Sequence, residues 1–407
     1  MNEKIKIGVF AGTIDGVTYH RFITPFEQLK KMYGDKFDYD LIDCVTDLNA
    51  LKQYDIITFN RLVTNKTPLI IRWLWQNQIP TVMDIDDYWE LPPYHGMYNQ
   101  YKMCQMDKVI KWHVRNADYV TTTTAHFAIK LDEMNERVYI FPNCLNTDDE
   151  QWKKSNKPIN KELITFAIIC GYHHLKDVEI LRGVNLPSNA RIVLCGYCDG
   201  GTIVNADGVE RRKCEDENDW NTMEYILSDN YKRVTKEYAK WLKDNRQTKN
   251  PTPQKFIDDT NNKYIRYTAK SLDEYGTMYN NIDVLIAPLK NTEFNRYKSE
   301  LKLVECGVKG VAAMVSHTKP YNTHNFEDIK EKRGNINVNG NVLFFDDNRR
   351  NINKKLKWLC DNPQYIELLQ KNLHDTITTK YDLSTWCVSR FEFYKMVKNN
   401  KKIFQIS

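Results

Sequence analysis

Short apolar runs alternate with longer amphipathic stretches along the first part of the chain. The runs are rich in β-branched and aromatic residues, which is typical of strands, and they lie at 4–12, 37–44, 54–61, 79–87, 118–124 and 137–143. Helical spacing of apolar positions occurs between them, at 19–34, 67–78 and 106–117. Strands separated by helices of this length predict a parallel sheet that is covered on both faces.

A polar stretch at about 150–162 predicts a linker, after which the alternation restarts. Further strand patterns lie at 163–171, 190–196, 263–270, 282–289, 310–316 and 341–347, and helical patterns end the chain. The charged stretch at about 199–262 has too few apolar residues for its own core, so we interpret it as an insertion. The sequence therefore predicts α/β domains at 1–155 and 156–380, followed by a helix within 381–407.

Composition narrows the possible classes of protein. The chain has 407 residues, which is too many for one ordinary core. Its net charge of +5 is too small to indicate a nucleic-acid partner by itself. No apolar run is long enough to span a bilayer, and the N-terminus opens as a strand, so we expect a cytoplasmic protein. Peripheral membrane attachment stays open, although no strong basic amphipathic N-terminal helix supports it.

The ten cysteines are scattered, and we expect them to be thiols. Cys195 and Cys198 form one C-x-x-C pair, at a strand end. Neither a second pair nor a helix N-terminus adjoins it, which favours ordinary thiols over zinc or redox chemistry.

Candidate ligand residues follow the predicted strands, because open α/β sheets bind ligands at the carboxyl ends of their strands. Gly12 and Gly16 follow the first strand, without the spacing of a dinucleotide fingerprint, so a ligand loop and a plain turn both stay open. Arg21, at the start of the next helix, is interpreted as an anion contact or a surface residue.

The loop at 84–95 groups carboxylates with a histidine. Asp84, Asp86 and Asp87 end a strand, and substrate contact is favoured over structural capping and over a metal site. His95 follows on the same loop and is either catalytic or structural.

The strand at 163–171 is followed by Gly171, His173 and His174 at the head of a helix. A helix N-terminus favours phosphate, and the ligand spacing of a zinc site is missing. The alternative is a simple capping segment.

The stretch 294–307 reads "FNRYKSELKLVECG" and places charges at a helix start. Ser299 is the predicted N-cap, with Lys302 three residues later. Unpaired amides at that end, together with Lys298, suit a diphosphate, and Glu305 suits the hydroxyls of a ribose. A solvated helix face is the alternative.

This stretch resembles the nucleotide-binding segment of family-4 glycosyltransferases, in the variant that reads roughly N-x-x-K-S-x-x-K-x-x-E. The segments "PTVMDIDDYWELP", "VRNADYVTTTTAHFAIKL", "RVYIFPNCLN" and "GYHHLKD" are similar to other parts of that family, in the same order. The resemblance covers most of the chain except the insertion. It implies the GT-B fold: two Rossmann-like domains with parallel sheets facing a central cleft, and a last helix that returns to the first domain.

The resemblance also implies an activity. It is that of a retaining, metal-independent glycosyltransferase that uses a nucleotide-diphosphate sugar, needs no cofactor, and acts on a glycan, lipid or protein acceptor. By similarity, Glu305 binds the ribose and Asn295 lies near the donor sugar, while Lys298 and the Ser299 amide hold the diphosphate. The residues that would face the acceptor, as catalytic candidates, are Asp86, Asp87 and His95.

The sequence departs from the family pattern in one place. The family has a first glutamate eight residues before the second, and here that position is Tyr297, which leaves the donor-sugar contact without its usual carboxylate. The usual arginine and lysine pair at the phosphates is not obvious either. Lys298, Arg296 and Arg21 are the alternatives.

Two other functions remain open. A transferase that modifies hydroxylated DNA bases would use the basic tail and the lysine-rich insertion, but a lysine run is usually a solvated face. A protein that binds nucleotide sugars without catalysis would share the same binding residues.

Overall fold

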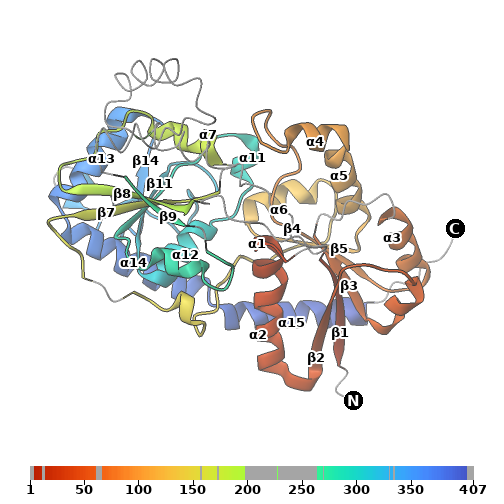
Figure 1. The fold of residues 1–407 in the computed structure, drawn as a ribbon. Coiled ribbons are helices and arrows are strands. Elements are labelled where there is room, and N and C mark those ends of the chain that lie inside the picture. The colour runs from red at the N-terminus through yellow and green to blue at the C-terminus, as the bar shows by residue number, and fades with distance from the viewer. Residues whose placement is uncertain are drawn as a thin grey trace. The chain divides into compact units, whose positions relative to one another are not determined.

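The computed structural model describes residues 4–11, 14–60, 67–155, 158–171, 174–197, 227, 264–268, 270–329, 331–332 and 335–400. Gly12 and His173 lie outside these residues, as does the predicted insertion apart from Leu227. The chain forms two compact units (Figure 1). Unit 1 comprises residues 1–148, 292–304 and 378–407, and unit 2 comprises residues 149–291 and 305–377.

Unit 1 is built on a six-stranded parallel sheet in the order β2-β1-β3-β4-β5-β6. Its strands are β1 (Ile5–Phe10), β2 (Phe37–Ile42), β3 (Ile56–Phe59), β4 (Thr81–Ile85), β5 (Tyr119–Thr122) and β6 (Val138–Ile140). Its helices are α1 (Gly16–Thr18), α2 (Thr24–Tyr33), α3 (Thr67–Gln76), α4 (Tyr98–Met103), α5 (Met106–Asn116), α6 (Ala125–Asp132), α11 (Glu293–Arg296) and α15 (Leu383–Asn399), with a π-helix at Tyr19–Ile23. The strand order reverses between β1 and β3, as in flavodoxin-like sheets.

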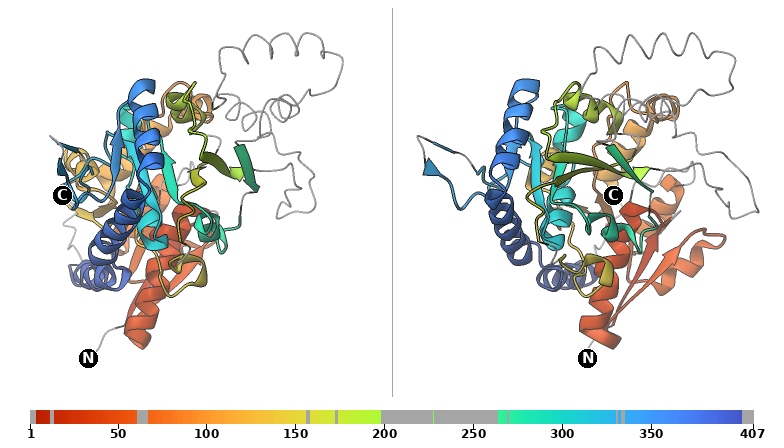
Figure 2. Two further views of the ribbon diagram at one scale, coloured as in Figure 1. Left: turned by 90° about the vertical axis from the view of Figure 1, so that its left-hand side faces the viewer. Right: turned by 60° about the vertical axis from the view of Figure 1, so that its left-hand side comes forward.

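Two helices that are far apart in the sequence lie side by side in unit 1. In the segment predicted as a helix at 19–34, the apolar side chains of Phe22, Phe26 and Leu29 are buried, and α2 ends at Gly34, whose φ is +54°. Across from α2, the α15 ring of Phe391 stacks on Tyr33 with their centroids 3.7 Å apart. The red α2 and the dark blue α15 stay adjacent in every view (Figures 1 and 2).

A buried ion pair joins the segments of unit 1. Arg21 donates from Nε and Nη2 to the two carboxylate oxygens of Asp84, each at 2.8 Å, and both side chains are 1% exposed. Its Nη1 also donates to the carbonyl of Phe141 at 2.6 Å and to Oδ1 of Asn143 at 3.0 Å. Thr121 on β5 donates to Asp84 at 2.7 Å. Burial lowers the pKa of Arg21, but the charge of Asp84, its hydrogen bonds and the charge of Asp86 together raise it by more, so the net shift is upward.

Unit 2 holds a second parallel sheet of six strands, in the order β14-β11-β10-β7-β8-β9. Its strands are β7 (Ile164–Ile169), β8 (Ala190–Tyr197), β9 (Tyr264–Thr268), β10 (Val284–Ala287), β11 (Ala312–Ser316) and β14 (Leu343–Phe345), with a separate antiparallel pair of β12 (Glu331–Lys332) and β13 (Asn335–Ile336). Its helices are α7 (Leu175–Val178), α13 (Arg349–Asp361), α12 (Leu301–Lys309) from residue 305 onward and α14 (Gln364–Lys380) up to residue 377. Along the chain the first strand of this sheet, β7, lies beside the fourth, β10, which is the doubly wound Rossmann order.

The core of unit 2 lies between this sheet and the helices α13 and α14, which run along it in Figure 1. The helix α12 approaches α14 closely, since a Cβ added at Gly307 would lie 2.3 Å from Cγ1 of Ile377. The predicted insertion falls between β8 and β9, the two strands at one edge of the sheet. The predicted α/β class and its parallel sheets are thus confirmed.

We predict that Asp84→Asn lowers the free energy of unfolding by about 3–5 kcal/mol, because the charge of Arg21 would stay buried without its carboxylate. Urea denaturation measures the loss. The control is Asp148→Asn, which breaks the exposed pair with Lys31 and changes the stability by less than about 1 kcal/mol. An equally small loss for Asp84→Asn would contradict the role given to this pair.

A second prediction concerns His113 on α5, which is fully buried, with neither ring nitrogen hydrogen-bonded within the described part of the chain. Burial lowers its pKa from 6.5 to about 4, so the unfolded chain binds the proton more readily. Stability should therefore fall by up to about 3 kcal/mol as the pH drops from 6.5 towards 4. His113→Leu should flatten this slope in urea titrations, and replacing the exposed His324 by Gln should not.

Candidate functional site

The switch point of unit 2 lies between β7 and β10, at the carboxyl ends of both strands. In an open α/β sheet, the crevice at that place is where ligands bind. The loop after β7 carries Gly171, which is exposed and has open space where a Cβ would point. His174 follows and leads directly into α7. Two of the predicted nucleotide-binding residues therefore lie at the switch point, and His173 lies outside the described residues.

The two loops of the switch point are joined by Asp177 on α7. Its Oδ2 lies 2.9 Å from Nδ1 of His174, and its Oδ1 accepts a hydrogen bond of 2.9 Å from the backbone amide of Lys290 after β10. The Lys290 side chain pairs separately with Glu179 at 3.2 Å. Asp177 is the last residue of the segment "GYHHLKD", but no local pattern reveals its link to Lys290, because the two residues lie 113 positions apart.

The start of α12 differs from the prediction. The helix begins at Leu301, and the carbonyl of Glu300 accepts from the amides of Leu303 at 2.8 Å and Val304 at 3.2 Å. Glu300 is therefore the flanking residue, and the prediction of Ser299 as N-cap is wrong by one position. The hydroxyl of Tyr381 holds the Glu300 side chain at 2.7 Å, a contact that no local pattern reveals.

The residues just before α12 belong to unit 1. Ser299 Oγ accepts from Nδ2 of Asn143 at 3.0 Å, which connects it to Arg21. Nζ of Lys298 lies 4.9 Å from the ring centroid of Phe294. Asn295 is buried within α11 and Arg296 is exposed. The phosphate and sugar contacts given to these residues remain predictions.

Glu305 lies in unit 2 and is 1% exposed. The hydroxyl of Tyr279 donates a hydrogen bond to its Oε2. Burial, and then the charge of Glu305, raise the pKa of Tyr279 well above its usual value, so the tyrosine stays a donor. Tyr279 fixes the orientation of the carboxylate, and the ribose contact of Glu305 remains a prediction.

The structure corrects the interpretation of Arg21 as an anion contact. Its guanidinium is buried and already donates to Asp84, Phe141 and Asn143. It acts as a structural residue of unit 1. The position beside a predicted ligand loop suggested otherwise because its partners lie 63 to 122 residues away in the sequence.

The acceptor-side candidates lie on the loop after β4. Asp86 is half-buried, and its Oδ1 accepts from Asn60 at 3.3 Å. Asp87 is half-buried beside it. His95 accepts from the amide of Met97 at 3.2 Å, and its ring meets Phe294 edge-on at 5.7 Å. Their catalytic roles remain predictions, and Gly12 lies outside the described residues.

Tyr297, which stands where the family has its first glutamate, packs into an aromatic cluster of unit 1. Its ring stacks against Tyr88 at 4.8 Å and against His126 at 5.0 Å, and it lies 5.3 Å from Phe127. The hydroxyl of Tyr88 donates to Glu293 at 3.0 Å. The residue thus contributes packing in unit 1 instead of the carboxylate that the family pattern has there.

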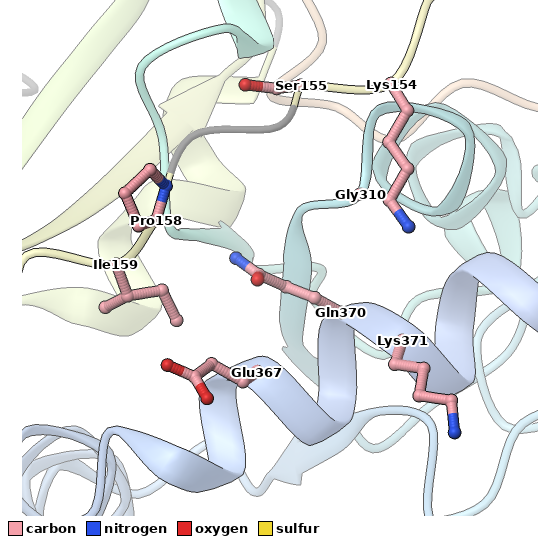
Figure 3. Close-up of a pocket in the computed structure, with 8 residues that line it drawn as sticks. All are labelled: Lys154, Ser155, Pro158, Ile159, Gly310, Glu367, Gln370 and Lys371. Atoms are coloured by element: carbon pink, nitrogen blue, oxygen red, sulfur yellow. The ribbon is translucent and has the colours of Figure 1, made fainter.

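A pocket of about 290 Å³ lies at the amino-terminal ends of the unit 2 strands, near the start of β11 (Figure 3). Figure 3 shows the α14 side chains of Glu367, Gln370 and Lys371 on one wall, with Pro158 and Ile159 on another. The residues that line it are Lys154, Ser155, Pro158, Ile159, Gly310, Glu367, Gln370 and Lys371. Parallel strands place it opposite the switch-point loops, so it is separate from the candidate site.

Within the described residues, no group of three or more His, Cys, Asp or Glu could hold a metal ion, and none of the cysteines there forms a disulfide; Cys198 and Cys214 lie outside. No helix of that part of the chain is long and apolar enough to cross a bilayer. In the basic tail, Lys395 forms an ion pair with Glu392 at 3.6 Å, and Lys398 forms one with Asp55 at 3.1 Å. Nearly all of the insertion behind the DNA hypothesis lies outside the described residues.

Comparison with known proteins gives the fold. No protein-family model and no curated protein matches the sequence. Solved structures match at 11–12% identity: sucrose-phosphate synthase from Thermosynechococcus elongatus (TM-score 0.62, covering 97% of this chain and 99% of that chain), Anabaena Alr3699/HepE in complex with UDP-glucose (0.55, 96% and 100%) and the catalytic domain of starch synthase IV from Arabidopsis thaliana bound to ADP and acarbose (0.54, 98% and 100%). These neighbours are GT-B glycosyltransferases, so the chain has the GT-B fold, as predicted.

We predict that Tyr279→Phe lowers the free energy of unfolding by about 1.5–3 kcal/mol, because it removes a hydrogen bond to a buried carboxylate. A double-mutant cycle with Glu305→Gln measures the coupling. The control is Tyr365→Phe, because the Tyr365 ring stacks on Trp358 of α13. Coupling near zero would show that the two side chains do not interact.

Proposed function

We propose that the protein is a glycosyltransferase that moves a sugar from a nucleotide-diphosphate sugar to a hydroxyl acceptor, with retention and without a metal. One observation carries the proposal: unit 2 has the Rossmann strand order, and its two switch-point loops are already linked by Asp177. The whole-chain likeness supports it, because the matching structures include HepE with UDP-glucose and starch synthase IV with ADP and acarbose.

The proposed transfer depends more on stabilising the charge of the leaving diphosphate than on covalent catalysis. The leaving diphosphate gains charge as the sugar departs, and preorganised amides and cations stabilise that charge. In this proposal the loops at Gly171, His174 and Lys290 hold the diphosphate. Glu305, oriented by Tyr279, binds the ribose hydroxyls. The resemblance adds Lys298 and Ser299 to the diphosphate contacts, and it adds the acceptor-facing roles of Asp86, Asp87 and His95.

A thermal-shift screen of UDP-, ADP- and GDP-sugars tests the proposal. At 100 times the dissociation constant, a ligand adds about 2.7 kcal/mol of stability, which raises Tm by about 5–10 °C. Glu305→Ala should weaken binding at least about tenfold and remove at least about half of the shift. The control is Glu367→Gln, in the pocket at the amino-terminal ends of the strands, which should keep the thermal shift.

The enzymatic part needs its own assay. Release of free nucleotide from the stabilising donor, with and without a hydroxyl acceptor, measures transfer and hydrolysis. Binding without either reaction would leave only a nucleotide-sugar-binding protein, and no shift with any donor would refute the nucleotide site itself. Loss of activity in Glu305→Ala with an unchanged nucleotide affinity would overturn the role of this carboxylate.

A further inference from the structure

We propose that Asp177 is a positioning residue of the nucleotide site: its single carboxylate sets the imidazole of His174 and the loop after β10 in one fixed arrangement for a diphosphate. The inference rests on the proposed function, because the ligand is the diphosphate of the nucleotide sugar. It adds a residue and a mechanism of preorganisation to that function.

The carboxylate of Asp177 holds its two donors firmly because it is buried. Asp177 is 5% exposed, and its two oxygens accept from opposite sides: Oδ2 from the ring of His174 and Oδ1 from the amide of Lys290, both at 2.9 Å. A buried carboxylate that lost either donor would keep the cost of its desolvation. The two contacts therefore hold the loops together more firmly than a solvated pair would.

The loop after β10 is also held from its other side. The amide of Leu289 donates to Oγ of Ser316 at 2.8 Å, and the hydroxyl of Thr318 donates to Oδ1 of Asn291 at 3.1 Å. These anchors come from the end of β11, whereas Asp177 comes from the end of β7. Because the loop is held from both neighbouring strands, its backbone is already ordered when an anion binds, and binding does not have to order it.

The contact also sets the tautomer of His174. An ionised carboxylate only accepts, so Nδ1 of the ring carries a hydrogen. The partner of the ligand is then the other nitrogen, Nε2, which accepts in the neutral ring and donates in the protonated ring. Asp177 thereby determines that Nε2, and not Nδ1, of the half-exposed His174 is the nitrogen that contacts the ligand.

A neighbouring carboxylate provides a matched control. Glu179, two residues later, accepts from Nζ of Lys290 at 3.2 Å and from Nζ of Lys176 at 2.8 Å, and its side chain is 23% exposed. Burial raises its pKa, and the two lysines lower it further than that, so the net shift is downward. Glu179 contacts the side chain of Lys290 but not its backbone amide, so Glu179→Gln removes a carboxylate charge and leaves the hydrogen bond of that amide in place.

Two substitutions separate the two functions of Asp177. Asp177→Asn keeps an oxygen for the Lys290 amide but turns an N–H₂ group towards Nδ1 of His174, which reverses the tautomer. We expect the affinity for nucleotide to fall about tenfold, with normal hydrogen-exchange protection of residues 288–291. Asp177→Ala removes both contacts, so we expect a loss of about a hundredfold together with faster exchange in that loop.

The measurement is calorimetric titration of UDP, ADP and GDP, with hydrogen exchange by mass spectrometry on the same samples. Glu179→Gln should bind within about twofold of the unsubstituted protein. If Asp177→Ala does not fold, the asparagine variant carries the test alone. A role confined to capping α7 predicts lower stability with unchanged affinity in the folded variants, and that result overturns the inference.

The first titration separates the two failures. If the unsubstituted protein binds none of the three nucleotides, the glycosyltransferase proposal fails and this inference fails with it. If it binds one of them, and both Asp177 variants bind it equally well, only the positioning role of Asp177 is refuted.

Discussion

The buried guanidinium of Arg21 joins several segments of unit 1. The guanidinium of Arg21 is removed from water, so it needs acceptors in fixed places, and these come from β4, from the carbonyl of Phe141 and from Asn143. Asn143 then donates to Ser299, some 156 positions further along the chain. The segment at 292–304, which separates two parts of unit 2, is joined to unit 1 by this contact and by the packing of Phe294 and Tyr297.

In unit 2 the buried charged groups are carboxylates, and they need hydrogen-bond donors in fixed places. There a buried carboxylate, Asp177, collects donors from two loops, and a second one, Glu305, takes the hydroxyl of a buried tyrosine. Both carboxylates are placed by partners within their own unit. A site built this way needs little rearrangement to accept an anion and a pair of hydroxyls, which is what the proposed donor would present.

Central strands such as β3, β7 and β10 were predictable from the sequence because they are buried on both faces and read as continuous apolar runs. The α2 boundary at Gly34 was predictable for an equally local reason. The polar pairs could not be predicted from the sequence, because no local pattern joins Arg21 to Asp84 or Asp177 to Lys290. The start of α12 was misplaced for the same reason: Glu300 flanks the helix with its side chain held by Tyr381, 81 residues later.

The place of the insertion at the sheet edge has a consequence for how the fold can vary. It joins β8 to β9, which are parallel, so a crossover of about a dozen residues is needed there in any case. Beyond that minimum, each doubling of the connection costs only about 0.6 kcal/mol in closure entropy. The chain can therefore gain or lose a whole module at this edge while β7 and β10 keep their register, so an accessory domain could be grafted there without altering the switch point.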